Sequence, residues 1–389
     1  MHSAAIVEAK ACFMVLKSFI EYPLECNPAD QQFGSSQSST HKRYAYPDPP
    51  PLDPISTYPT DHRPLQFFSF RAIGSSSYRR AEPNCWTVST SDVQYADIPD
   101  GRSFLGVPRH YRHSILVLQR AVKNWNSHQK LKFCVNFGDI VDGFCPKEES
   151  LTAVKGVVKE FDNFNGPSYH MLGNHCLYNL PRKTLIELLR IPSLNGHAYY
   201  DFSPIPEFRF VVLDGYDISA IGWPQDHPNS FEAMKVLQTK NPNAEKNSPM
   251  GMEGLERRYL MFNGAVGKEQ LEWLDGVLRD SSMHGQKVIV CCHLPLDPGA
   301  SSPEALMWNY DEVMDVIHRY KCVKACLAGH DHKGGYSVDS HGVHHRVLEA
   351  ALECPPGTDA YGHIDVYHDR LSLSGRDKAQ PLVIRHGGT

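Results

Sequence analysis

The chain has 389 residues, 41% of them hydrophobic and 21% charged, which is enough to bury one large core or two ordinary ones. Its formal charge of −5 provides no basic surface for nucleic acid, and no apolar run reaches the roughly 20 residues of a membrane helix. We therefore expect no nucleic-acid partner and no membrane anchor. The eleven cysteines are odd in number and include the adjacent pair Cys291 and Cys292, which favours reduced thiols in the cytoplasm over a secreted disulfide framework.

The first 66 residues differ in composition from the rest of the chain. Residues 31–40 are rich in Ser and Gln, and residues 47–54 are rich in proline, which fixes φ and removes hydrogen-bond donors. We expect residues 1–66 to form a disordered or extended Pro/Ser-rich arm, and residues 67–380 to form the folded domain. Residues 1–20 are mildly apolar but contain no arginine, so an organellar signal there is the lesser alternative to a cytoplasmic location.

The first candidate metal ligands, Asp92 and Gln94, follow a run at residues 85–90 that predicts a strand. At a strand end the chain can turn, so that a carboxylate and a carboxamide two residues apart approach one ion. An earlier apolar run, residues 67–70, is separated from Asp92 by an irregular insertion at residues 71–84. If residues 85–90 form the central strand, Asp92 is presented to a site; if residues 67–70 do, Asp92 is displaced.

Next along the chain, residues 111–125 have helical spacing and residues 131–137 predict a strand that stops at Gly138. Glycine permits a sharp turn, so the carboxylate of Asp139 can project into a site and bridge two cations, although a turn or cap aspartate is the competing interpretation. We expect Asp142 to support its loop through hydrogen bonds.

A predicted helix at residues 151–164 leads to a short strand at residues 168–172 and then to Gly173. Asn174 offers a neutral carbonyl oxygen as a weak ligand, and His175 is adjacent as a possible proton donor. Ordinary turn chemistry explains this motif equally well when it is taken alone.

The second half of the chain repeats the order of strand and polar residue. A strand at residues 287–292 ends at His293, and a strand at residues 323–328 leads to His330 and His332. Asp214 also follows a strand and is expected to be a turn or supporting residue. The other predicted elements are a strand at 208–213, a polar loop excursion over the site at 222–254, helices at 268–278 and 311–320, and a returning antiparallel strand at 343–349.

Each motif is weak alone, but five of them occur at the carboxyl ends of predicted strands, where open α/β sheets place their sites. Carboxylate, amide and imidazole ligands without a thiolate suit Mn, Fe, Co, Ni or Zn. The predicted ligands are Asp92, Gln94, Asp139, Asn174, His293, His330 and His332.

The order D-x-Q, GDxxD, GNH, H and GHxH resembles that of the calcineurin-like metallophosphoesterases over residues 86–372. Gln94, residues 173–179, residues 308–310 and residues 330–336 are similar to the manganese-dependent ADP-ribose/CDP-alcohol diphosphatase branch. The resemblance implies an α/β fold, a four-layer α/β/β/α sandwich with mixed sheets.

Position by position, the resemblance implies that Asp92, Gln94 and His332 hold one metal ion. Asn174, His293 and His330 would hold the other, and the bridging ligand is Asp139. His175 would contact phosphate or protonate the leaving group.

The resemblance also implies a monomeric enzyme with two divalent ions, most naturally manganese, and a small nucleotide-diphosphate substrate. Metal-activated hydroxide would split ADP-ribose or a CDP-alcohol (CDP-choline, CDP-ethanolamine or CDP-glycerol) into a nucleoside monophosphate and a phosphorylated product. Gln94 stands where the superfamily usually has histidine, so we expect looser metal binding and dependence on added manganese.

Five further residues are candidates for substrate binding. Aromatic stacking on a base and a cation for phosphate would suit Phe104, Arg112 and His113, although helix-start packing and surface charge explain them equally well. Trp308 and Tyr310 either line the pocket or fill the core.

Two alternative functions remain open at this point. One is a phosphomonoesterase or cyclic-nucleotide phosphodiesterase of the same superfamily. The other is a non-catalytic scaffold on the same fold, as in the metallophosphoesterase-like retromer subunit, but a scaffold would be expected to lose ligands and all seven positions are filled here.

Overall fold

The computed structural model describes residues 85–103, 106–128, 131–193 and 195–385. The expected N-terminal arm, the irregular insertion at 71–84 and Phe104 lie outside these ranges. Residues 85–90 form β1 (Cys85–Thr90), which pairs with β4 (Phe133–Asn136) in parallel and with β12 (Ala360–Val366) antiparallel. The run next to Asp92 is therefore the central strand, which resolves the choice that the sequence left open.

Two six-stranded mixed sheets form the middle of the fold. The first has the order β14 (Leu382–Arg385), β13 (Arg370–Asp377), β12, β1, β4, β5 (Ser168–His170). The second has the order β10 (Gly335–Val338), β11 (His344–Val347), β9 (Val323–Ala328), β8 (Lys287–Cys291), β7 (Phe208–Val212), β6 (Tyr200–Ile205). We expected the domain to end at residue 380, but the first sheet continues beyond that residue through β14.

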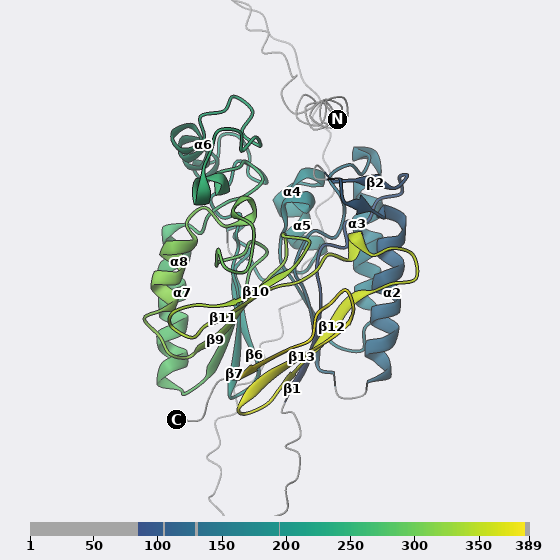
Figure 1. The fold of residues 1–389 in the computed structure, drawn as a ribbon, viewed down its shortest axis with the longest axis vertical. Helices are drawn as coiled ribbons and strands as arrows, with labels where there is room; N and C mark the ends of the chain where they lie inside the picture. Colours follow the sequence, from purple (N-terminus) through teal and green to yellow (C-terminus); the bar gives the residue numbers. More distant parts are fainter. Residues whose placement is uncertain (1–84, 104–105, 129–130, 194, 386–389) are drawn as a thin grey trace, which may run out of the picture. The chain divides into compact units, whose positions relative to one another are not determined.

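The sheets pack face to face and helices cover their outer faces, which confirms the expected α/β/β/α sandwich (Figure 1). Phe133 of the first sheet contacts Phe202 and Phe210 of the second, with ring centroids 5.4 and 5.1 Å apart. Trp125 joins a helix to the first sheet through Tyr361 at 5.9 Å. Large buried aromatic side chains of this kind each contribute about 2–3 kcal/mol.

The longer helices follow the predicted apolar spacing. On the outer side of the first sheet lie α2 (Tyr111–Ser127) and α3 (Lys147–Asp162), and on that of the second lie α7 (Lys268–Met283) and α8 (Tyr310–Ile317) (Figure 1). The remaining elements are α4 (Asn174–Asn179), α5 (Arg182–Leu188), α6 (Pro228–Lys240), η1 (Gly254–Arg258), η2 (Pro303–Ala305), η3 (Ala351–Glu353), β2 (Gly101–Arg102) and β3 (Pro108–Arg109). None of the described helices is both long and apolar enough to cross a membrane.

The loop-rich excursion at 222–254 also contains α6, a helix that we did not expect, which buries Ala233 and Leu237 in a small second core. One expectation from the sequence was wrong. The strand β11 is not antiparallel to the strand before the histidine motif. Strand β11 runs parallel to β9 and antiparallel to β10. Strand β10 is a short strand between β9 and β11 in the chain that the sequence did not predict.

Candidate metal centre

The predicted ligands emerge at the carboxyl ends of parallel strands in both sheets. Strands β1, β4 and β5 of the first sheet deliver Asp92, Gln94, Asp139 and Asn174, and strands β8 and β9 of the second deliver His293, His330 and His332. The chain turns sharply at these ends, since φ is 50° at Asp92, 40° at Gln94, 50° at Asp139 and 68° at His330. Such left-handed backbone costs about 1–3 kcal/mol per residue and concentrates at functional sites.

Two motif glycines allow the strand ends to approach one another. A Cβ atom on Gly173 would lie 2.0 Å from Oδ1 of Asp139, and one on Gly329 would lie 2.1 Å from Oγ of Ser91 and 2.9 Å from Oδ2 of Asp92. Any side chain at either position would displace a candidate ligand. The glycines therefore set the spacing of the site.

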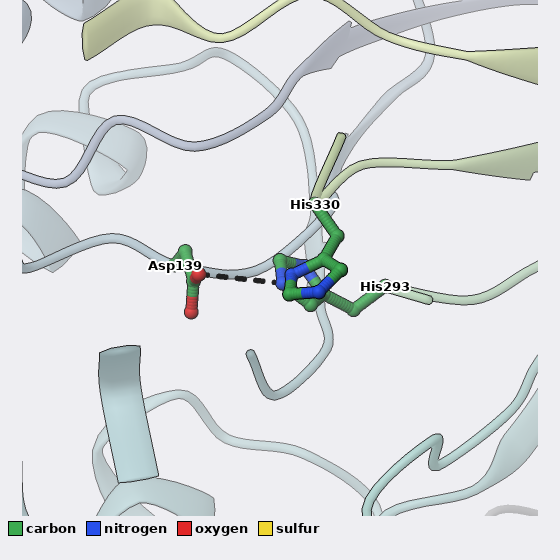
Figure 2. Close-up of side chains that lie close together, drawn as sticks. All are labelled: Asp139, His293 and His330. Carbon is green, nitrogen blue, oxygen red and sulfur yellow. Dashed lines mark ion pairs between the residues drawn. The ribbon is translucent and has the colours of Figure 1, made fainter. Parts of the chain in front are cut away.

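Asp139, His293 and His330 form a compact group with ligand atoms within 4.8 Å of one another (Figure 2). Oδ2 of Asp139 lies 3.3 Å from Nε2 of His293. The rings of His293 and His330 are 5.0 Å apart between centroids. Asp139 is fully buried, and its Oδ1 accepts a hydrogen bond from the backbone N–H of His175 at 2.8 Å.

Asp92, Gln94 and His332 form a second group beside Asp139. Nε2 of His332 lies 3.5 Å from Oδ1 of Asp92 and 2.8 Å from the side-chain amide of Gln94. The same amide lies 3.5 Å from Oδ2 of Asp139, so Asp139 lies next to both groups. Asn174 adjoins the site through Tyr216, whose hydroxyl donates to Oδ1 of Asn174 at 3.2 Å and whose ring is 6.0 Å from His293.

The imidazoles are oriented by hydrogen bonds at their other nitrogens. Nδ1 of His293 donates to the carbonyl of Phe137 at 2.6 Å, which leaves Nε2 with a free lone pair. Nδ1 of His332 lies 3.0 Å from Glu353, so its Nε2 faces Asp92. Partners of this kind fix the tautomer of metal-binding histidines.

The orientation of His330 follows from the hydrogen bonds of Asn263. The side-chain amide nitrogen of Asn263 donates to the carbonyls of Arg258 at 2.9 Å and Glu304 at 2.6 Å, so its Oδ1 must be the atom 2.9 Å from Nε2 of His330. Nε2 of His330 therefore carries the proton, and Nδ1 has a free lone pair.

The charges of the cluster favour cations. Burial raises the pKa of Asp92, but the hydrogen bond and charge of His332, the charge of His293 and the hydrogen bond from Ser91 together outweigh it and hold that pKa below its usual range. Burial opposes protonation of His332, yet Asp92 and Glu353 raise its pKa to about 9. In the same way, burial is outweighed at His293, where Asp139 raises the pKa to about 8. Carboxylates that draw protons onto imidazoles would equally attract a metal ion in place of those protons.

Comparison with known proteins identifies the family. Residues 90–334 match the calcineurin-like phosphoesterases. This chain belongs to that family. A rice protein named manganese-dependent ADP-ribose/CDP-alcohol diphosphatase is 68% identical over 288 residues, which cover 74% of this chain and 90% of the relative. A human protein of the same name is 38% identical over 314 residues, covering 76% and 91%. The crystal structure of a dimetal phosphatase from Danio rerio is similar with a TM-score of 0.76 and 36% identity, covering 79% of this chain and all of that one.

The candidate substrate-binding residues of this phosphoesterase differ in their exposure and contacts. Arg112 is exposed, and its Nε contacts Asp97 at 2.5 Å, so it ties the start of α2 to the preceding loop. Nε2 of His113 lies 3.4 Å from Arg120. Trp308 is 1% exposed, and its Nε1 donates to the carbonyl of Leu260 at 3.1 Å, which makes it a core residue. Tyr310 is half-buried at the start of α8.

Sequence reasoning missed Arg109, which β3 places beside the site. Its Nη1 lies 3.9 Å from Oδ2 of Asp142, and its positive charge acts on the pKa values of His332 and Glu353. Its Nε is buried and has no hydrogen-bond partner among the described residues. Neither Arg109 nor Glu353 belongs to a recognisable motif, so no signal in the chain distinguished them from other charged residues.

His175 and Asp142 complete the neighbourhood. As expected, Asp142 supports its loop, because its Oδ1 accepts a hydrogen bond from the backbone N–H of Phe144 at 2.8 Å. The N–H of Gly143 donates to Nδ1 of His175 at 2.8 Å. Nδ1 of His175 is thus an acceptor, and the ring proton is on Nε2.

Proposed function

We propose that this phosphoesterase is a two-metal hydrolase that cleaves the pyrophosphate linkage of ADP-ribose and of CDP-alcohols such as CDP-choline, with manganese as its metal. The observation that carries the proposal is the convergence of carboxylate, amide and imidazole groups from five strand ends around Asp139. The names of the rice and human relatives and the dimetal phosphatase support the substrate class and the metal.

In this proposal Asp92, Gln94 and His332 hold one ion, Asn174, His293 and His330 hold the other, and Asp139 bridges them. The donor set fits, because Nε2 of His293 is buried without a hydrogen-bond partner among the described residues, and Oε1 of Gln94, also unpartnered, would face the ion once the side-chain amide turned over. A buried lone pair without a partner costs about 1–3 kcal/mol unless a cation meets it.

The chain's own groups then bind the phosphates and move the proton. Bound divalent cations would supply an activated water and neutralise phosphate charge. Nε2 of His175 carries the ring proton and is the group that protonates the leaving phosphate oxygen. Arg109, whose Nε is unpaired, takes the role of phosphate cation that we had expected of Arg112.

The test is a substrate panel under controlled metal. Purified protein is stripped with chelator, resupplied with manganese and assayed with ADP-ribose, CDP-choline, cyclic AMP and an aryl phosphate. We expect hydrolysis of the first two, lost on chelation and restored by manganese. Activity that survives exhaustive chelation, or a preference for cyclic AMP or the aryl phosphate, would contradict the proposal.

The remaining alternatives predict other results in the same panel. A scaffold would hydrolyse none of the four compounds. We further propose a monomer in the cytoplasm, a location supported by eight cysteines of the described part of the chain, from Cys134 to Cys354, which are unpaired and buried.

A further inference from the structure

A second set of metal-ligating side chains meets at the end of α8, away from the candidate metal centre. His318 is the C-cap residue of α8, and Asp339 and His341 lie in the turn between β10 and β11. One ligand atom from each lies within 4.8 Å of the other two. We call these three residues the α8 cluster.

The α8 cluster lies at the opposite end of the sheet from the candidate metal centre. Strand β11 runs parallel to β9 and begins with His344 opposite Ala325, so the turn before it lies at the amino end of β9. The six residues of β9, at about 3.3 Å each, place the cluster about 20 Å from the turn that carries His330. The two sites cannot share an ion.

Asp339 is fixed in place by the fold itself. Its Oδ1 accepts hydrogen bonds from the backbone N–H groups of His341 at 2.8 Å and Val343 at 2.9 Å. Its Oδ2 lies 2.8 Å from Nε2 of His318 and 3.2 Å from Nε2 of the buried His345. A carboxylate held from both sides is preorganised, so a cation would not have to order it.

The charge of Asp339 has no permanent counterion. The Asp339 side chain is 9% exposed, and two backbone N–H groups donate to it, which stabilises its charged form. Among the described residues its ion-pair partners are histidines, and neither lysine nor arginine pairs with it. A bound divalent cation would place a permanent positive charge beside this carboxylate.

The spacing of the donors suits one metal ion. Ligands about 2.1 Å from a tetrahedral ion are separated by about 3.4 Å, so the 2.8 Å between His318 and Asp339 would open by about 0.6 Å on binding. The ring of His341 stacks on that of His318 with centroids 3.7 Å apart and 15° between planes. Because His341 is exposed, its ring can turn toward the ion without disturbing the core.

We propose that His318, Asp339 and His341 form an additional metal site, specific for zinc-like cations, that joins the end of α8 to the β10–β11 turn. Two imidazoles and one carboxylate suit Zn²⁺, Co²⁺ and Ni²⁺, whereas Mn²⁺ binds such a set most weakly of the first-row series. The site would fill with zinc at concentrations where manganese leaves it empty.

The test counts zinc bound per chain after equilibrium dialysis. The full chain is compared with His341→Ala and with His284→Ala, a matched control in which an exposed histidine next to a single aspartate, Asp280 at 3.2 Å, is removed. We expect His341→Ala to bind one zinc fewer than the other two proteins. Zinc should also raise the melting temperature of the wild type and the control by more than that of His341→Ala.

The test depends only on the difference in bound zinc between the variant and the other two proteins, so its result does not depend on whether the candidate metal centre also binds zinc. Equal melting temperatures without metal verify that His341→Ala is folded, and His341→Gln serves as a second variant. Equal zinc counts in the wild type and both His341 variants would overturn the proposal, as would an equal loss in the control. In that case Asp339 only closes the turn and ties it to α8.

Discussion

Replacing Asn263 tests whether hydrogen bonding at Nε2 of His330 controls metal binding. Asn263→Ala removes the acceptor 2.9 Å from that nitrogen and both donor bonds to the carbonyls of Arg258 and Glu304. Asn263→Asp keeps an oxygen toward His330 but cannot donate to the two carbonyls. The pair of variants therefore separates the orientation of His330 from the anchoring of the loop.

The expected magnitude follows from the partners that are lost. Losing the hydrogen-bond partner of a metal-binding histidine typically lowers metal affinity about 10–100-fold, which corresponds to about 1.4–2.7 kcal/mol. We expect Asn263→Ala to weaken Mn²⁺ binding by that factor and Asn263→Asp to recover most of it. Both variants should lose similar thermal stability, because both release the loop.

The assay is a Mn²⁺ titration followed by electron paramagnetic resonance of the free ion, with melting temperature as the measure of loop anchoring. Equal loss of Mn²⁺ affinity in the two variants would refute the reasoning, since the loop anchor would then explain the whole effect. Unchanged affinity in Asn263→Ala would show that His330 needs no such partner.

Three further predictions concern the same site. The pKa of His332 is raised to about 9, so its proton stabilises the metal-free protein fully below about pH 6.5, and this stabilisation is lost as the pH rises through 9. Mn²⁺ must displace that proton, so its affinity should rise by up to about tenfold per pH unit between pH 7 and 9 and then level off. Mn²⁺ titrations at several pH values measure this dependence. Gly173→Ala places a Cβ against Asp139 and should lower kcat at least about a hundredfold, whereas Gly276→Ala, with open space around it, should have no effect on kcat. Arg109→Ala should raise KM for ADP-ribose about tenfold or more in steady-state assays while Arg112→Ala does not, and equal effects would reassign the phosphate contact.

The positions of the candidate ligands could be predicted because the signals are local. An apolar run followed by glycine and a polar residue encodes a strand, a turn and a projecting side chain within a few residues, as at Gly173 and at Gly329. The structure adds a physical reason for these glycines, which is the lack of room for a Cβ atom. The roles of the ligands remain proposals that the metal titrations test.

Residues that act through contacts with distant parts of the chain could not be predicted from the sequence. Glu353 contacts His332 across 21 positions and Asn263 contacts His330 across 67, and neither is marked by a motif. The sequence left Trp308 open between the pocket and the core, and Arg112 between the substrate and surface charge; burial of the first and the ion pair of the second favour the core and a surface contact.

The sequence by itself determined which strands end in which polar residues, and therefore the α/β class and the chemistry of the candidate centre. Tertiary structure alone decided that β1 is the central strand, that β11 is parallel to β9, and that Arg109 lies beside the site. Periodicity and turn residues act over a few positions of the chain. Strand order and the partners of each ligand depend instead on how the strands pair and the two sheets pack, which brings together residues as far apart in the chain as Gln94 and His332.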